Sequence, residues 1–184
     1  ESSNFLRIDM ENSKNTDSTF KIYNDLFKIY PKVGVVLQAY LKRSIADIEK
    51  LAGPGFNARI CKGIYKENKN IAYQDPEDIS KNFLAMAKVM LAKNSYACYA
   101  THDLQLIDDL VSLTKEMDAD PSKFEFQVLY GVPMKGKLKK LLKSGYKVRL
   151  YVPYGPDWYE YSIRRLKENP NIAGYVIKNL FAKK

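Results

Sequence analysis

Short runs of alternating apolar and polar side chains recur along the chain, and longer segments with helical periodicity separate them. Six of these runs predict β-strands over 5–10, 32–38, 57–61, 96–100, 124–129 and 147–152. The intervening patterns predict helices over 18–30, 44–51, 76–93, 104–117, 134–143 and 158–168. Strands that alternate with helices in this way form a parallel sheet with covering helices, so we expect the α/β class.

Two α/β architectures share this rhythm, an open doubly wound sheet and a closed β/α barrel. The segment GPGFNA over 53–58 superficially matches a dinucleotide-binding turn, but a helical pattern precedes it and a strand pattern follows it. Phosphate binding at such a turn needs the strand first and a helix N-terminus after the glycines. We therefore interpret this segment as a loop between a helix and a strand.

Strand alternation favours the barrel. Arg7 and Asp9 alternate with apolar residues in the first run, and Glu125 and Gln127 do so in the fifth. A barrel strand has one face against the helices and one face toward the interior, whereas an open sheet covered on both sides has nearly continuous apolar strands. A closed barrel usually needs eight strands and ~250 residues. With six strands in 184 residues, either two units are absent from this chain or the sheet is not closed.

Composition adds a basic charge and a cysteine pattern without metal-ligand spacing. The chain has 30 Lys and Arg against 21 acidic residues, a formal charge of +9 that suits nucleic acid, anionic lipid or a phosphorylated cofactor. The densest lysine cluster, 134–143, has the pattern of a solvated helix face. Cys61 and Cys98 have no partner at zinc or disulfide spacing, which predicts two buried thiols in a reducing compartment. No apolar run approaches the ~20 residues of a membrane-spanning helix.

Polar side chains gather where each predicted strand ends. They are Asp9, Glu11, Gln38, Arg59, Lys62, Thr101, His102, Gln127 and Tyr151. The carboxyl ends of parallel barrel strands are where active sites are assembled. We therefore expect a site at this rim.

The last predicted helix carries two adjacent arginines, Arg164 and Arg165, close to several tyrosines and the single tryptophan. Neighbouring guanidinium groups repel each other unless solvent or an anionic group compensates their charge. A solvated surface helix and an anion-binding site are both consistent with this pattern.

The segments RIDMENS, VVLQAYLKR, ARICKGIYKE, ATHD, FEFQVLYG and YSIRRLKEN, taken in order, resemble the motif series of the proline dehydrogenase family over residues 5–169. That family comprises monofunctional bacterial flavoenzymes and the proline dehydrogenase domain of a bifunctional enzyme. The resemblance implies a distorted (β/α)8 TIM-type barrel of which six βα units are present, a single catalytic domain over 1–184. It also implies that the chain begins at the family's third barrel strand.

The resemblance implies oxidation of L-proline to Δ1-pyrroline-5-carboxylate in proline catabolism, with FAD as first electron acceptor and a quinone as second. Arg164 and Arg165 match a pair that holds the proline carboxylate. Arginine suits this role because a guanidinium group meets a carboxylate through two parallel hydrogen bonds. Tyr151, Tyr161 and Leu129 match residues that wall the proline ring.

The same resemblance implies a set of cofactor-binding residues. Arg59 matches a cation beside flavin N5, and Asp9 matches an active-site aspartate that orients its neighbours, so these two are the candidate catalytic residues. The cofactor-binding candidates are Met10, Gln38, Arg59, Lys62, Gly63, Ile64, Tyr65, Thr101, His102 and Glu168. Ile64 and Lys66 depart from the alanine and the frequent aromatic residue of relatives. No metal site is implied.

Two alternatives stay open at this point. A basic nucleic-acid-binding module would need aromatic and cationic side chains on one exposed face, and here they fall at separate strand ends. An aldolase-like barrel would need a Schiff-base lysine in a strand, for which Lys147 is the candidate.

For the proline dehydrogenase interpretation we expect a bacterial cytoplasmic location with peripheral contact to the inner membrane, or the mitochondrial inner membrane in a eukaryote. We expect no nucleic-acid partner, and the sequence does not determine the oligomeric state. If two strands are absent, we also expect impaired activity of the isolated chain, because its sheet would keep open edges.

Overall fold

A single parallel sheet organises the protein in the computed structural model, which describes residues 4–152 and 154–156. Its strands are β1 (Leu6–Ile8), β2 (Val33–Gln38), β3 (Asn57–Cys61), β4 (Tyr96–Ala100), β5 (Phe124–Leu129) and β6 (Val148–Tyr151). The helices are α1 (Thr16–Ile29), α2 (Ser44–Leu51), α3 (Pro76–Ala92), α4 (Leu104–Glu116) and α5 (Lys137–Lys143), with short 3-10 turns η1 (Ser13–Asn15) and η2 (Pro121–Lys123). All six predicted strands are therefore present.

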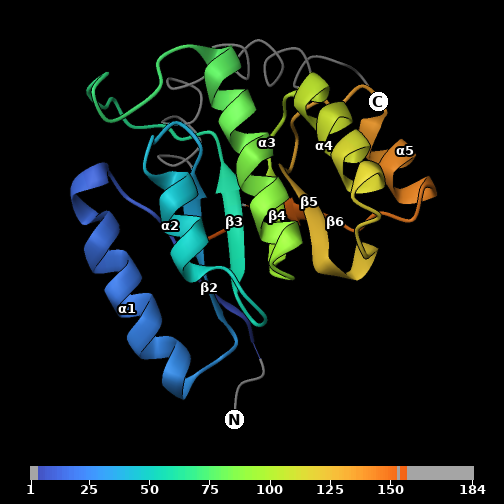
Figure 1. The fold of residues 1–184 in the computed structure, drawn as a ribbon. Coiled ribbons are helices and arrows are strands. Elements are labelled where there is room, and N and C mark those ends of the chain that lie inside the picture. Colours follow the sequence, from blue (N-terminus) through green and yellow to red (C-terminus); the bar gives the residue numbers. More distant parts are fainter. Residues whose placement is uncertain (1–3, 153, 157–184) are drawn as a thin grey trace.

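Strand order decides between the two candidate architectures. The strands pair in parallel in the order β1-β2-β3-β4-β5-β6, without the reversal that a doubly wound sheet requires. Each connection thus crosses to the next neighbour in the same direction and leaves its helix on the same face. Figure 1 shows α2, α3 and α4 side by side in front of the strands. The sheet curls into a half-barrel, which confirms the predicted TIM-type α/β class.

The helix predictions hold, but two helices begin at other residues than predicted. The helix α1 begins at Thr16 rather than at 18. The helix α5 begins at Lys137 rather than at 134, because Lys135 and Gly136 have φ angles of 44° and 77°, in the left-handed region that a right-handed helix excludes. The helix α3 begins as predicted, where the Asp75 side chain accepts a hydrogen bond from the Glu77 backbone N–H and Pro76 occupies the first turn. The predicted helix over 158–168 lies outside the described residues. Within the described part of the chain, no helix has the length and apolar character needed to cross a membrane.

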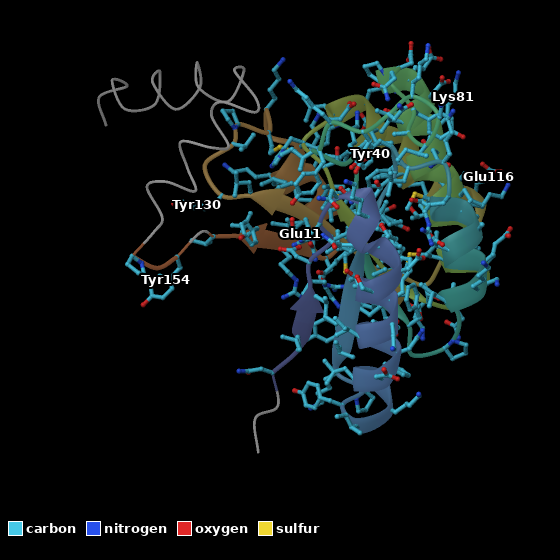
Figure 2. The ribbon with its side chains drawn as sticks, turned by 90° about the vertical axis from the view of Figure 1, so that its left-hand side faces the viewer. Glu11, Tyr40, Lys81, Glu116, Tyr130 and Tyr154 are labelled. Carbon is cyan, nitrogen blue, oxygen red and sulfur yellow. The ribbon has the colours of Figure 1, made fainter. Side chains whose placement is uncertain are left out.

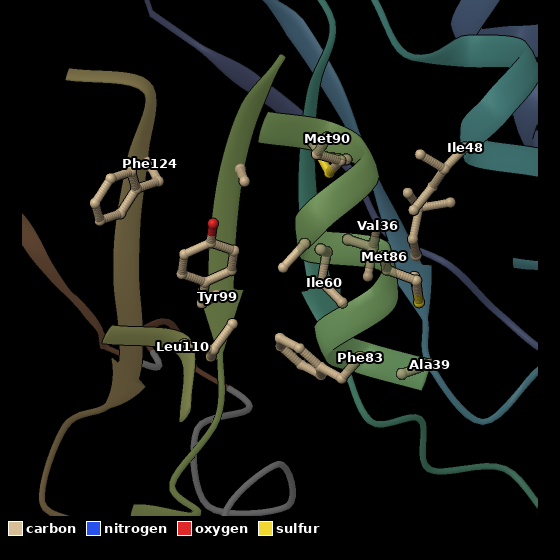
Figure 3. Packing of buried hydrophobic residues seen from close by; sticks show 14 of the residues in the cluster. Val36, Ala39, Ile48, Ile60, Phe83, Met86, Met90, Tyr99, Leu110 and Phe124 are labelled. Atoms are coloured by element: carbon tan, nitrogen blue, oxygen red, sulfur yellow. The ribbon is translucent and has the colours of Figure 1, made fainter. Parts of the chain in front are cut away.

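The apolar core lies between the sheet and the helices. Ile60 on β3 and Tyr99 on β4 point toward the helix layer, where they meet Phe83 and Met86 of α3 and Leu110 of α4 (Figure 3). These side chains are essentially inaccessible to solvent. The Tyr99 ring also packs against Phe124 and Phe126 of β5, with ring centroids 5.8 and 5.5 Å apart. Burial of this layer stabilises the curved sheet from its convex side.

The opposite, concave face of the sheet is polar. By the strand register, the side chains that share this face are Arg7, Asp9, Gly34, Val36, Gln38, Asn57, Arg59, Cys61, Tyr96, Cys98, Ala100, Glu125, Gln127, Leu129, Lys147, Arg149 and Tyr151. The alternation in the sequence therefore corresponds to the interior of the half-barrel.

Arg7 closes the amino-terminal end of this concave face. Its guanidinium group donates to the carbonyl oxygens of Val35 and Asn57 at 2.9 and 3.0 Å and to the Asn57 side chain at 2.6 Å. Gly34 makes room for it, because a Cβ at that position would lie 2.6 Å from Arg7 Nη1 and 2.4 Å from the Asn57 carbonyl oxygen. Burial lowers the pKa of Arg7, and the neutral acceptors around it compensate part of the lost hydration.

A substitution at Tyr99 tests the apolar packing. Its hydroxyl is buried and has no hydrogen-bond partner among the described residues, so its removal ends a desolvation cost without loss of a bond. We expect Tyr99→Phe to leave the free energy of unfolding unchanged or to raise it by about 1 kcal/mol in urea titrations.

Tyr96→Phe on the same strand is the matched control. The Tyr96 hydroxyl donates to Glu125 and accepts from Lys147, so its loss is expected to destabilise the fold by about 1 kcal/mol. A Tyr99→Phe protein that is destabilised as much as Tyr96→Phe would show that the Tyr99 hydroxyl has a partner.

Candidate functional site

The carboxyl ends of β1, β2 and β3 bring two predicted catalytic residues together. Asp9 follows β1 and forms an ion pair with Arg59 of β3, across Val36 of the intervening strand. The Asp9 side chain is 71% exposed, whereas that of Arg59 is 22% exposed. Arg59 therefore lies on the concave face, and among the described residues its counter-charge is the Asp9 carboxylate, which is exposed at the rim.

Gln38 ends β2 beside this pair. Its side chain is buried, and its Nε2 donates to the backbone carbonyl of Glu11 at 2.8 Å. The Glu11 carboxylate in turn accepts a hydrogen bond from the Tyr65 hydroxyl at 2.5 Å. The segment that follows β1, which includes buried Met10, is thus held against both the end of β2 and the loop after β3.

The loop over 62–75, between β3 and α3, is anchored at several points. The Ser13 backbone N–H and hydroxyl donate to the Glu67 carboxylate at 2.7 and 2.9 Å. At its other end, the Tyr73 N–H donates to the Tyr40 carbonyl at 2.7 Å, and Leu41 pairs with Ala72 in an isolated antiparallel bridge. Figure 2 labels Glu11 and Tyr40, which this loop contacts through Tyr65 and Tyr73.

Gly63 in this loop is required by the fold itself. Its φ angle is +103°, and a Cβ at this position would lie 2.1 Å from an atom of the Tyr40 ring. Any larger residue would therefore meet both backbone strain and a steric clash. Ile64 and Tyr65, which follow it, are both exposed in part.

Lys62 pairs with a residue that the sequence analysis did not single out. Its Nζ lies 2.7 Å from Asp103 Oδ2. Asp103 also caps α4, where its other oxygen accepts from the N–H groups of Gln105 and Leu106. Burial raises the pKa of Asp103, but the Lys62 cation and the capping bonds outweigh it, so the net pKa lies below the ordinary value. An aspartate directly before the helical pattern at 104 is a cap signal that could have identified it.

Thr101 and His102 lie together at the end of β4. The Thr101 hydroxyl accepts from the Asp103 N–H at 3.1 Å, and the Leu129 backbone N–H donates to His102 Nε2 at 2.8 Å. His102 is thus neutral with its proton on Nδ1, and burial lowers its pKa. This contact joins the rim of β4 to the end of β5, where Leu129 pairs with Tyr151 of β6.

The structure therefore places the described candidates along one rim of the half-barrel: Asp9, Met10, Gln38, Arg59, Lys62, Gly63, Ile64, Tyr65, Thr101, His102, Leu129 and Tyr151. Tyr161, Arg164, Arg165 and Glu168 lie outside the described residues. Lys147, the Schiff-base candidate, precedes β6 at the opposite end of the sheet and donates to the Tyr96 hydroxyl at 3.0 Å.

The titration of His102 gives a pH test of this arrangement. His102→Gln keeps an acceptor for the Leu129 N–H but does not titrate. Because the pKa of folded His102 is below its unfolded value, near 6.5, the unfolded state binds more protons on acidification. We expect the wild-type protein to lose stability relative to the variant as the pH falls below about 6.5 and toward the folded pKa.

Urea unfolding of both proteins between pH 5 and pH 8 measures this difference. His102 is the only histidine of the chain, so no other histidine contributes to the comparison. Stability curves that run parallel through the whole range would contradict a neutral, hydrogen-bonded His102.

Comparison with known proteins identifies the family. The proline dehydrogenase family matches residues 1–177. Proline dehydrogenase 1 of Bacillus subtilis is 39% identical over 97% of this chain, and Proline dehydrogenase of Deinococcus radiodurans is 36% identical over 96%. The chain spans 59% and 57% of the lengths of these relatives.

Solved structures agree with this assignment. Proline utilization A from Bdellovibrio bacteriovorus, inactivated by N-propargylglycine, superposes with a TM-score of 0.79 and 25% identity, covering 90% of this chain and 20% of that one. Proline utilization A from Bradyrhizobium japonicum (a D779Y mutant) superposes with a TM-score of 0.76 and 24% identity over the same shares, and supports the fold alone. The chain belongs to the proline dehydrogenase family.

Proposed function

We propose that this chain forms the catalytic part of a flavin-dependent proline dehydrogenase, which oxidises L-proline to Δ1-pyrroline-5-carboxylate. Curated relatives that match almost the whole chain are named proline dehydrogenases. The observation that carries the proposal is the position of Arg59, a partly buried cation on the concave face at the rim, paired to Asp9 across one strand. A barrel enzyme assembles its chemistry at this rim.

The donor set of the rim fits FAD. Two cations, Arg59 and Lys62, lie at the end of β3, and each has one carboxylate partner in the described structure. They suit an anionic pyrophosphate and a ring that becomes negatively charged on reduction. Gln38, Thr101 and His102 add neutral hydrogen-bonding groups, and Ile64 and Tyr65 add exposed apolar surface. Met10, whose side chain is buried, would contribute its backbone. These residues, with Gly63 and Glu168, are the proposed FAD-binding set.

Bound FAD would supply the acceptor, at its N5 atom, for the hydride that leaves proline C5. The substrate also releases its N–H proton, which leaves a C5=N double bond and balances the two-electron oxidation. Arg59 would stabilise the negative charge that develops on the acceptor in the transition state. Asp9 would hold the Arg59 guanidinium group in place and limit the cost of burying an unpaired cation.

The proline site would lie next to β5 and β6. Leu129 and Tyr151 are paired residues at the ends of these strands and point to the concave face. They would form an apolar wall for the pyrrolidine ring, together with Tyr161, while Arg164 and Arg165 would bind the carboxylate. His102 Nε2 already accepts the Leu129 backbone N–H, so this nitrogen is occupied, which suits a binding role.

Further parts of the proposal concern the setting of the reaction. We propose a single catalytic domain over 1–184 and a quinone as second electron acceptor, with a bacterial cytoplasmic location at the inner face of the membrane. The relatives named above are bacterial, which supports this location. The aldolase alternative loses support because Lys147 lies at the amino-terminal end of the sheet, away from the rim.

A chimaera tests the proposed activity. Residues 1–177 would replace the matching segment of Bacillus subtilis proline dehydrogenase 1, so that the relative supplies the remainder of its own length. We expect a yellow protein whose flavin absorbance bleaches when L-proline is added and stays unchanged with D-proline. A folded chimaera that binds FAD but does not bleach with L-proline would contradict the proposed substrate.

Arg59→Met in the same chimaera tests the role of the cation. We expect the rate of flavin bleaching by L-proline to fall by about 10²–10³-fold, the effect of removing one charge-stabilising donor. Stopped-flow absorbance measures the rate.

Lys115→Met is the control, because it removes one exposed positive charge at the carboxyl end of α4, opposite the rim. A bleaching rate of Arg59→Met within a factor of about three of the control would exclude a role for Arg59 in the transition state.

A further inference from the structure

A buried carboxylate lies beneath the rim, inside the half-barrel, and the mechanism above does not use it. The side chain of Glu125 on β5 is 1% exposed, and it accepts four hydrogen bonds. Its Oε1 accepts from Arg149 Nε at 2.5 Å and from Gln127 Nε2 at 2.6 Å. Its Oε2 accepts from Arg149 Nη2 and from the Tyr96 hydroxyl, both at 2.9 Å.

This arrangement holds Glu125 ionised. Burial favours the neutral carboxyl and would raise the pKa of Glu125, but the donors from Arg149, Gln127 and Tyr96 outweigh it and lower the pKa. Arg149 grips the carboxylate through two parallel bonds from the neighbouring strand β6. Its own side chain is 63% exposed on the concave face. Arg149 thus fixes the Glu125 carboxylate as a hydrogen-bond acceptor below the rim.

The consequence lies one inner-face position nearer the rim, at Gln127. Its NH₂ group is bound to Glu125, and a carboxylate can accept but cannot donate, so the amide cannot reverse without placing its oxygen against another oxygen. The Gln127 carbonyl oxygen is therefore directed away from Glu125. Its register neighbours are Ala100 on β4 and Arg149 on β6, and the small Ala100 side chain occupies little of the concave face on the β4 side of the amide.

We propose that Glu125 and Arg149 are positioning residues that fix the Gln127 amide with its oxygen presented to the ligand as a hydrogen-bond acceptor. The ligand group it fits is an N–H donor, and for a bound flavin this is the imide N3–H of the ring. The identity of the ligand rests on the proposed function. The orientation of the Gln127 amide is independent of the proposed function, because it follows from the hydrogen bond to Glu125.

A purely structural role for Glu125 would have a different signature. A polar network that only supports the sheet stabilises the fold but leaves ligand selectivity unchanged when it is weakened. Tyr96→Phe is the matched control, because it removes one donor from the same carboxylate on the side away from Gln127. Tyr96→Phe therefore lowers the stability of the network without changing the orientation of the Gln127 amide.

Side-chain amide NMR of the full 184-residue chain tests the orientation without any ligand. Gln127→Met identifies the two NH₂ cross-peaks of Gln127 by their loss. We expect one of these protons to be shifted to low field and protected from solvent exchange in the wild-type protein and in Tyr96→Phe. Glu125→Gln should weaken both properties, because its side chain can face Gln127 either with an oxygen that accepts or with an NH₂ group that cannot. Unprotected Gln127 protons at ordinary positions in the wild-type protein would overturn the inference, and this outcome does not depend on whether Glu125→Gln folds.

Ligand selectivity tests the functional part, with lumiflavin and 3-methyllumiflavin as probes whose binding is followed by fluorescence quenching. We expect Glu125→Gln and Gln127→Met to weaken lumiflavin binding about 3- to 10-fold, the worth of one hydrogen bond, and to leave 3-methyllumiflavin binding unchanged. Tyr96→Phe should change neither. Equal weakening of both flavins, or no change for either, would overturn the positioning role. A wild-type chain that binds neither flavin would contradict flavin binding by this chain, and the NMR result alone would then decide the orientation of Gln127.

Discussion

The need to pair charged side chains inside a curved parallel sheet constrains this structure more than any other feature. Helices cover the convex face, so the polar members of each alternating strand must lie on the concave face. There, a charge without a partner would carry a large desolvation cost. Arg7 and Arg59 meet this requirement through other strands, Arg7 with carbonyl and amide acceptors of β2 and β3 and Arg59 with Asp9 after β1. The buried Glu125 of β5 meets it through the largely exposed Arg149 of β6. Charge compensation on the concave face therefore depends on the order and register of the strands.

The three arginines also divide the concave face into levels with different chemistry. Arg7 lies at the amino-terminal end among neutral acceptors, which suits a structural role. The Glu125–Arg149 pair lies above it, and its carboxylate accepts four hydrogen bonds from the described residues. Arg59 lies near the rim, where Asp9 is its single described counter-charge and is itself largely exposed. A rim cation with one exposed counter-charge can interact electrostatically with a ligand, whereas the deeper hydrogen-bonded groups fix the positions of neighbouring side chains.

The loop after β3 shows how the same residues serve both the fold and the site. Gly63 is fixed by the Tyr40 ring, Lys62 by the Asp103 cap of α4, and Tyr65 by Glu11. None of these contacts requires a cofactor, yet together they bring cationic, apolar and hydrogen-bonding groups to one edge. Substitutions in this loop are therefore expected to affect stability and ligand binding together.

The strands, most helices and the division of each strand into an apolar and a polar face could be predicted from the amino-acid order alone, because periodicity and caps act over a few neighbouring residues. The amino-acid order also indicated which strand ends carry candidate chemistry. The partners of these side chains could not be predicted, since they lie far apart in the chain. Asp9 and Arg59 are separated by 50 residues, Lys62 and Asp103 by 41, and His102 and Leu129 by 27. Such contacts depend on strand order, register and the path of each crossover. The positive φ angles before α5 and the close approach of Tyr40 to Gly63 could not be predicted for the same reason. Each arises from the packing of the whole chain rather than from the local sequence.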